Sequence, residues 1–186
     1  MDNELSAALH TPNYVLRPLQ LTDAETIYTL RSSEEVNEFL NRPLATSIDD
    51  AIIFIKKIIA MENAFYRAIT IKNTGDLAGT ITIYNIDPEN DRAEVGYELL
   101  PQFQGKGIMK EVLHATIEFA FYKMRLKSLE GWLQEGNIKS ILLLKKFGFE
   151  RDIAGEKDRL EPGMNEVIYR LSAEKWKNLA LPKLRI

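Results

Sequence analysis

The stretch PQFQGKGIMKEVL, residues 101–113, leaves an apolar segment, passes through Gly105, Lys106 and Gly107, and enters an amphipathic sequence. Two glycines and a lysine at the start of a helix favour a bound anion, because a helix N-terminus presents unpaired N–H groups at the positive end of its dipole. Glycine has no Cβ, so its backbone can approach a phosphate closely. The alternative is a tight strand-to-helix turn that binds no ligand.

Two known glycine motifs do not fit this stretch. The dinucleotide-binding fingerprint requires Gly or Ala at the position of Lys110, and the P-loop pattern GxxxxGK[ST] is absent from the chain. The sequence therefore predicts neither a dinucleotide-binding fingerprint nor a P-loop at this turn.

The bulk composition excludes several classes of protein. A chain of 186 residues with 45% apolar residues predicts one domain, residues 1–186, with a real hydrophobic core. A net charge of −3 with well-mixed charges argues against nucleic acid as a partner. The chain has no cysteine, which excludes disulfides, thiolate metal sites and a cysteine nucleophile, and His10 and His114 are too few for a histidine metal centre.

The same reasoning argues against a membrane protein. The start MDNELSAALH lacks the pattern of a signal peptide, and the apolar run at 51–61, AIIFIKKIIAM, is short and contains two lysines. We expect a cytoplasmic protein with no membrane partner.

The order of elements predicts an α/β fold with a mixed sheet. Alternating apolar residues predict strands at 13–20, 65–72, 77–86, 92–100, 128–133, 149–154 and 164–172. Helical periodicity and capping signals predict helices at about 22–31, 47–64, 104–124, 137–147 and 173–179. Three consecutive strands form a meander, and the helix at 104–124 makes a parallel crossover. Gly148 is expected at C′ of the preceding helix, with Leu144 in contact with Phe149 as in a Schellman motif.

Two motifs together resemble a known family. Gln102-x-x-Gly105-x-Gly107, after a strand and before a helix, resembles the [QR]xxGx[GA] coenzyme A motif of the GNAT N-acetyltransferase superfamily. Asn137-Ile-Lys-Ser140, followed by LLLKKFGFE at 142–150, resembles the second motif of that superfamily. The combined pattern, strong over about residues 92–150, is most similar to the branch that includes ribosomal-protein N-terminal acetyltransferases.

The resemblance implies a fold and a co-substrate. The fold would be a mixed, mostly antiparallel sheet that splays between two central parallel strands and is flanked by helices. The co-substrate would be acetyl-CoA, with its pantetheine arm paired to backbone groups of about Leu99 and Leu100 and hydrogen-bonded by Asn137. The amides implied to bind its pyrophosphate are those of Gln104, Gly105, Lys106, Gly107 and Ile108.

Acetyl transfer to an amine needs a neutral amine, N–H donors for the developing oxyanion and a proton for the leaving thiolate. The donors are expected near Leu100. Many GNAT enzymes use a tyrosine seven residues after the motif asparagine as the acid, but that position is Leu144 here. The resemblance to the ribosomal-protein branch implies Ser140 instead, although Ser140 also suits a polar position in the first turn of a helix.

The general base has several candidates. Glu94 and Glu98 share one face of a strand by its period of two, and Glu130 lies in a neighbouring predicted strand. Each also suits a solvated strand face, and water could remove the proton instead.

The sequence therefore predicts an acetyl-CoA-dependent N-acetyltransferase that transfers acetyl directly to a primary amine, without a metal. The acceptor is either a protein N-terminal amine or a small amine such as a polyamine, an aminosugar or an amino-acid derivative. Acceptor pockets of the family include the segment that corresponds to 32–47, where Glu34, Glu35 and Glu38 would suit a cationic acceptor. A homodimer is common in the family.

Two other functions remain open at this stage. One is a catalytically inactive, coenzyme A-binding regulatory domain, and the other is a nucleotide-phosphate-binding domain without acyl chemistry.

Overall fold

The computed structural model describes residues 7–61, 65–161 and 163–179. Its strands are β1 (Leu9–His10), β2 (Tyr14–Pro18), β3 (Phe65–Ile71), β4 (Leu77–Asp87), β5 (Arg92–Leu99), β6 (Ser128–Gln134), β7 (Glu150–Arg151) and β8 (Glu166–Ser172). Its α-helices are α2 (Ala24–Ser32), α3 (Glu34–Asn37), α4 (Ile48–Ile59), α5 (Ile108–Glu118), α6 (Ile138–Lys146), α7 (Ile153–Arg159) and α8 (Ala173–Asn178). Short 3-10 helices precede α2 (Leu21–Asp23) and follow β5 (Pro101–Phe103), and a π-helical turn (Phe119–Lys123) extends α5.

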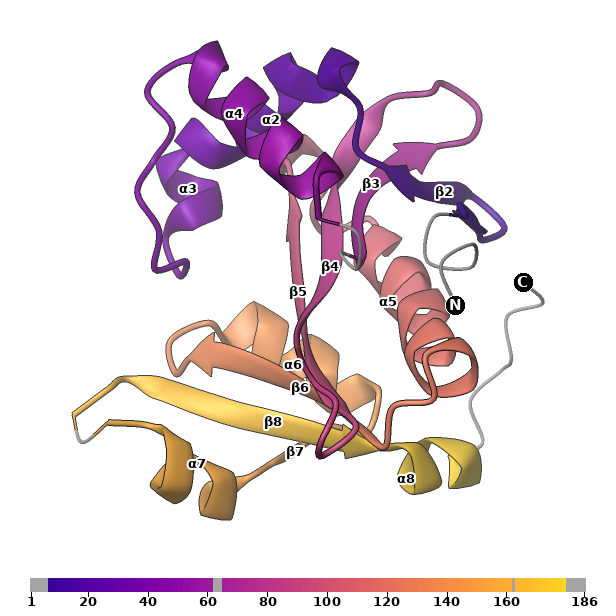
Figure 1. Cartoon of the computed structure of the whole chain (residues 1–186), viewed down its shortest axis with the longest axis vertical. Helices are drawn as coiled ribbons and strands as arrows, with labels where there is room; N and C mark the ends of the chain where they lie inside the picture. Colours follow the sequence, from indigo (N-terminus) through magenta and orange to yellow (C-terminus); the bar gives the residue numbers. More distant parts are fainter. Residues whose placement is uncertain (1–6, 62–64, 162, 180–186) are drawn as a thin grey trace. The chain divides into compact units, whose positions relative to one another are not determined.

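In the described part of the chain the strands form one sheet in the order β1-β2-β3-β4-β5-β6-β8-β7 (Figure 1). β5 and β6 run parallel, with register pairs from Arg92↔Ser128 to Glu94↔Glu130. The pairs β1/β2, β2/β3, β3/β4, β6/β8 and β7/β8 are antiparallel. The predicted mixed, mostly antiparallel sheet with one parallel pair is confirmed.

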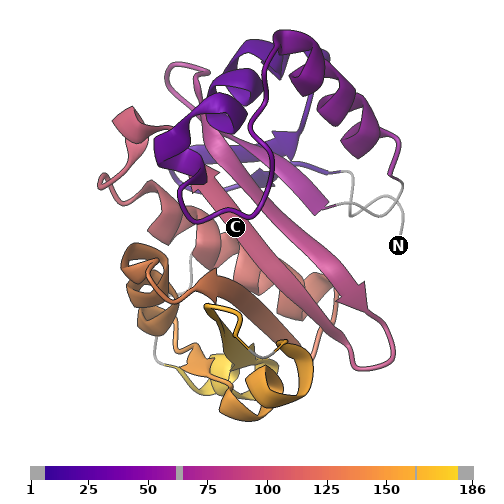
Figure 2. The same ribbon diagram turned by 90° about the vertical axis from the view of Figure 1, so that its left-hand side faces the viewer.

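The chain divides into two compact units, and β4 and β5 each pass from one into the other. In the first unit, whose described residues are 7–61, 65–84 and 96–115, α2 and α4 pack on one face of β3 and β4 (Figure 2). The buried side chains of this core are Leu19, Ala24, Ile27, Leu30, Ala51, Ile55, Ala68, Leu77 and Leu100. Ser47 caps α4 as predicted: its Oγ accepts the Asp50 N–H at 3.3 Å, and Asp50 accepts the Ser47 N–H at 3.1 Å. This reciprocal capping box fixes the start of α4.

The second unit contains 85–95, 116–161 and 163–179 among its described residues. β6 pairs with β8 along its whole length, from Ser128↔Ser172 to Gln134↔Glu166. α6 packs closely on β6 at Gly131, where an added Cβ would lie 2.4 Å from Cδ1 of the fully buried Leu144. This packing gives Leu144 a structural role.

The end of α6 confirms the predicted Schellman motif. Gly148 has a φ of +84°, its N–H donates to the Lys145 carbonyl at 3.0 Å, and the Phe149 N–H donates to the Leu144 carbonyl at 3.2 Å.

Three predicted elements need correction. The helix expected from Gln104 begins only at Ile108, because residues before it form a 3-10 turn and a loop. The strand expected at 149–154 is limited to β7, since Asp152 caps α7 by accepting the Gly155 N–H at 3.0 Å. The helix expected at 47–64 ends at Ile59 as α4, and residues 62–64 lie outside the described part of the chain. β1, α3 and α7 were not predicted.

Gly79 lets β4 approach the end of β5 closely. A Cβ added at Gly79 would lie 2.1 Å from the Glu98 carbonyl oxygen and 2.8 Å from Leu99 Cα. Backbone atoms cannot give way as a flexible side chain can, so β5 would have to shift.

We predict that Gly79→Ala lowers the free energy of unfolding by more than about 2 kcal/mol, as expected for overpacking against backbone. The matched control is Gly75→Ala: Gly75 has a φ of +78° and open space around an added Cβ. Its cost is the strain of the left-handed conformation alone, about 1 kcal/mol. Urea unfolding measures both, and an equal or smaller loss for Gly79→Ala would contradict the close approach.

Candidate active site

The turn before α5 is open and glycine-dependent. Gly105 and Gly107 have φ values of +71° and +80°, which side chains other than glycine rarely adopt. A Cβ added at either glycine meets no atom within 4 Å, and Gly105, Lys106 and Gly107 are exposed. The turn is therefore not closed by packing against neighbouring side chains of the described residues.

The backbone N–H groups of this turn are mostly unpaired. Those of Gly105, Lys106, Gly107 and Ile108 have no hydrogen-bond acceptor among the residues that the structure describes. The Gln104 N–H, predicted as a fifth donor, instead donates to the Pro101 carbonyl at 3.1 Å. Four adjacent donors at the N-terminus of an eleven-residue helix form an arrangement that suits an anion.

The hydrogen bonds at the end of β5 bear on the oxyanion donor expected near Leu100. The Leu100 N–H donates to the Ala78 carbonyl of β4 at 3.0 Å, so this amide is already engaged. Because hydrogen-bonding groups alternate between the two edges of a strand, the N–H of Leu99 points away from β4. The Leu99 carbonyl accepts Nε2 of Gln104 at 3.2 Å. On its β6 side, β5 has no register pair beyond Glu94 in the described part of the chain.

Glu98 lies among polar partners of the first unit. Its side chain is 6% exposed, and Oε2 lies 2.5 Å from Nη2 of Arg42. Its Oε1 accepts the Thr80 hydroxyl at 3.1 Å, and Thr80 in turn lies 3.2 Å from the Tyr66 hydroxyl. One oxygen of this candidate base is therefore occupied by a guanidinium.

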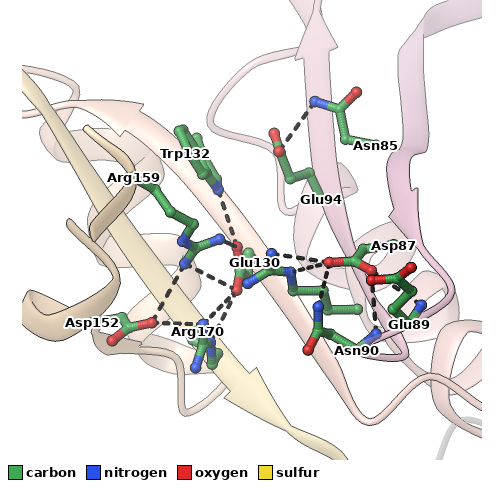
Figure 3. Close-up of polar contacts among 11 residues, drawn as sticks. Asn85, Asp87, Glu89, Asn90, Glu94, Glu130, Trp132, Asp152, Arg159 and Arg170 are labelled. Carbon is green, nitrogen blue, oxygen red and sulfur yellow. Dashed lines mark hydrogen bonds and ion pairs between the residues drawn. The ribbon is translucent and has the colours of Figure 1, made fainter. Parts of the chain in front are cut away.

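The other two candidate bases belong to the second unit. Glu94 is half-buried and accepts Nδ2 of Asn85 at 3.1 Å (Figure 3). Glu130 has a side chain that is only 2% exposed, and it lies at the centre of an ion-pair cluster with Arg159 at 2.7 Å and Arg170 at 2.9 Å (Figure 3). Glu130 is therefore the least suited of the three to accept a proton.

The charge state of Glu130 follows from two opposing effects. Burial is the largest and raises the pKa of its carboxyl, but the hydrogen bonds and charge of Arg159, with hydrogen bonds from Trp132 and Arg170, hold the pKa below its ordinary value. Asp152 joins the cluster by pairing with Arg170 at 2.8 Å.

We predict that Glu130→Gln lowers the free energy of unfolding by about 3–5 kcal/mol at pH 7, because two arginines lose a buried partner. Since the folded-state pKa of Glu130 is lowered, its contribution is present above the unfolded pKa of about 4.3 and is lost as the pH falls through the folded pKa. Urea unfolding from pH 7 to pH 3 should therefore show a weaker acid dependence in Glu130→Gln than in the wild type. The control is Glu89→Gln, an exposed glutamate of the same unit, and equal acid dependence in all three proteins would contradict this role.

The Asn-x-x-Ser motif forms the start of α6. Asn137 is its N-cap residue, and Oδ1 accepts the Ser140 N–H at 3.2 Å. Both side chains are half-buried, and Nδ2 of Asn137 and the hydroxyl of Ser140 have no hydrogen-bond partner among the described residues. The cap thus leaves one donor on Asn137 and the whole hydroxyl of Ser140 available to a ligand.

The segment 32–47, predicted to contact the acceptor, contains one basic residue as well as three acids. Glu34, Glu35 and Glu38 are exposed. Arg42 lies in the same segment and forms an ion pair with the buried Glu98. The sequence analysis did not predict a role for Arg42. A signal was present in the sequence: an arginine within a segment otherwise rich in acids.

Comparisons with known proteins show the family to which the chain belongs. A family model described as an acetyltransferase (GNAT) domain matches residues 13–150. The chain belongs to the GNAT acetyltransferase family. The resemblance predicted from the two motifs is confirmed, and with it the class of enzyme, an N-acetyltransferase.

Individual relatives extend this assignment. An uncharacterized N-acetyltransferase, p20 of Bacillus licheniformis, is 31% identical over 147 residues, which cover 77% of this chain and 83% of the relative. A spermidine N(1)-acetyltransferase of Escherichia coli K12 is 24% identical over 135 residues, 72% of this chain and 71% of the relative. A solved structure from Vibrio cholerae, described as a "putative ribosomal-protein-serine acetyltransferase", shares the fold with a TM-score of 0.73 at 22% identity, over 89% of this chain and 97% of that one.

The described residues contain no cluster of three or more histidine or acidic side chains that could hold a metal ion. None of their helices is both long and apolar enough to cross a bilayer.

Proposed function

We propose that the protein is an acetyl-CoA-dependent N-acetyltransferase that transfers acetyl directly to a primary amine. The observation that carries the proposal is the row of four unpaired N–H groups, from Gly105 to Ile108, in an open turn at the start of α5. The turn fits a diphosphate, because its donors are adjacent and no Cβ covers them. We also propose that residues 1–186 form a single catalytic domain.

The residues proposed to hold the co-substrate follow the two motifs. The diphosphate binds to the amides of Gly105, Lys106, Gly107 and Ile108, with Gln104 as a fifth donor if its bond to Pro101 opens. The pantetheine arm pairs with backbone groups of Leu99, and with those of Leu100 if the bonds of Leu100 to Ala78 and Phe103 open, and Nδ2 of Asn137 donates to it. Two observations support these assignments: β5 and β6 have no register pair beyond Glu94 in the described part of the chain, and Nδ2 of Asn137 has no hydrogen-bond partner there.

Bound acetyl-CoA supplies an acetyl thioester: the amine nitrogen forms the new bond to the acetyl carbon, the carbon–sulfur bond breaks, and the leaving thiolate takes a proton to become the thiol of coenzyme A. We assign Ser140 as the donor of that proton, because its hydroxyl is free at the cap of α6. The amine loses its proton to Glu98 or Glu94, directly or through water. The N–H of Leu99 is the better candidate for the oxyanion donor, since that of Leu100 is engaged.

The acceptor is a small amine or the N-terminal amine of a protein. The spermidine acetyltransferase supports the first class, and the ribosomal-protein-serine acetyltransferase structure supports the second. A cytoplasmic location, expected from the sequence, stays a prediction, as does a homodimer, which only the family resemblance suggests. The alternative is a coenzyme A-binding regulatory domain without catalysis, which would bind coenzyme A but release no thiol with any amine.

We predict that Gly107→Val weakens coenzyme A binding by at least about tenfold, because a β-branched side chain both strains the positive φ and covers the adjacent amides. Isothermal titration calorimetry with coenzyme A measures the effect. The control is Gly75→Val, which carries the same strain in an exposed turn with open surroundings. Equal affinity in Gly107→Val and wild type would remove the turn from the binding site.

We predict that Ser140→Ala lowers kcat by about a hundredfold, the usual contribution of a general acid, while the Kd for coenzyme A is unchanged. Free-thiol release with a panel of amines and peptides measures kcat. The control is Ser172→Ala, another helix cap of the same unit, which should cost about 1 kcal/mol of stability and leave kcat unchanged. If Ser140→Ala keeps full turnover, the proton comes from another group.

A further inference from the structure

The strongest unused feature of the first unit is a half-buried arginine. Arg31, in the last turn of α2, stacks its guanidinium over the Phe54 ring of α4, 4.0 Å from the ring centroid. Its five N–H donors have no hydrogen-bond or ion-pair partner among the described residues. A cation–π contact uses no hydrogen bond of the guanidinium, so the contact with Phe54 leaves its N–H donors unpaired.

Arg31 lies in the electrostatic neighbourhood of the candidate base. Burial is the main cause that lowers the pKa of the Arg31 guanidinium, and the positive charge of Arg42 lowers it further, whereas Tyr66 and Glu98 raise it. Arg42 itself lies 2.5 Å from Glu98. Arg31, Arg42 and Glu98, from α2, the segment before α4 and β5, thus form one group.

This group carries an uncompensated positive charge. It contains two guanidiniums and one carboxylate, and the carboxylate pairs with Arg42. Glu34, Glu35 and Glu38 of the neighbouring segment are exposed, and none of them forms an ion pair with Arg31. A half-buried guanidinium without a partner costs free energy, so a ligand that supplies the missing negative charge is stabilised there.

We propose that the acceptor of this enzyme is an amine that also carries a carboxylate, and that Arg31 binds this carboxylate. The inference rests on the proposed function, because it places the acceptor beside Glu98. The planar fork of a guanidinium matches a carboxylate with two parallel hydrogen bonds, which a lysine cannot reproduce. The acids of the 32–47 segment, which suggested a cationic acceptor, face solvent and do not offset Arg31.

The test compares matched acceptors that differ only in charge. The small-molecule pair is 4-aminobutyrate and 4-aminobutyramide, and the peptide pair is Ser-Asp-Ala-amide and Ser-Asn-Ala-amide; spermidine serves as the cationic acceptor. Thiol release with saturating acetyl-CoA gives kcat/KM for each. We expect the wild type to favour the acid over its amide by about tenfold or more in at least one pair, as a charge-assisted hydrogen bond predicts. The pair that shows the preference distinguishes a free amino acid from a peptide as the source of the carboxylate.

The variants separate binding from general charge effects. Arg31→Gln should bring the acid-to-amide ratio close to one, and Arg31→Lys should give an intermediate ratio. Comparing ratios between proteins cancels the different basicity of the two amines. The control Lys57→Gln removes an exposed positive charge of the same unit and should keep the wild-type ratio. If Arg31→Gln does not fold, the acid-to-amide ratios of the wild type and of Arg31→Lys test the proposal.

A second measurement does not depend on turnover. With coenzyme A bound, the acid should raise the melting temperature of the wild type more than the amide does, and Arg31→Gln should lose this difference. Preference for the amide or for spermidine, or an unchanged ratio in Arg31→Gln, would overturn the inference. If coenzyme A binds but no amine releases thiol, the proposed function fails, and the melting-temperature comparison alone decides whether Arg31 binds a carboxylate.

Discussion

Unpaired backbone N–H groups at the start of a helix are the feature on which the proposed chemistry depends. A helix must begin with donors that have no acceptor within it, and most proteins satisfy them with a capping side chain or water. Here Gly105 and Gly107 turn the chain with positive φ, and the four consecutive amides from Gly105 to Ile108 have no hydrogen-bond acceptor among the described residues. This concentration of positive partial charge favours a bound anion, so we propose the turn as a binding site rather than a simple connection.

Other contacts of the first unit fix the positions of the β5 backbone and of the Glu98 carboxylate near the end of this strand. Gly79 allows β4 to approach Glu98 and Leu99, and the bond from Leu100 to Ala78 fixes which edge of β5 each amide faces. Arg42 and Thr80 orient the Glu98 carboxylate. In the second unit, Asn137 combines two tasks, because its oxygen caps α6 while its amide nitrogen stays available. The four turn amides, Nδ2 of Asn137 and the Ser140 hydroxyl thus have no partner among the described residues, whereas the Gln104 and Leu100 amides and the Glu98 carboxylate are engaged.

The sequence was most informative where local chemistry decides the structure. The positive φ values of Gly105 and Gly107, the Ser47 cap and the Schellman end at Gly148 all depend on residues close together in the chain. Individual hydrogen bonds and ion pairs between residues far apart in the chain could not be predicted from the sequence. No local pattern indicates that the Leu100 amide bonds to β4, that two arginines enclose Glu130, or that Arg42 reaches Glu98 across 56 residues. α7 was missed because its stabilising cap, Asp152, was read as part of a strand.

The most direct test of the central claim is a crystal structure of the protein with acetyl-CoA bound. The account predicts diphosphate oxygens at hydrogen-bond distance, about 2.7–3.2 Å, from the nitrogens of Gly105, Lys106, Gly107 and Ile108. A complex in which the co-substrate binds elsewhere, with these four amides facing only water, would contradict it.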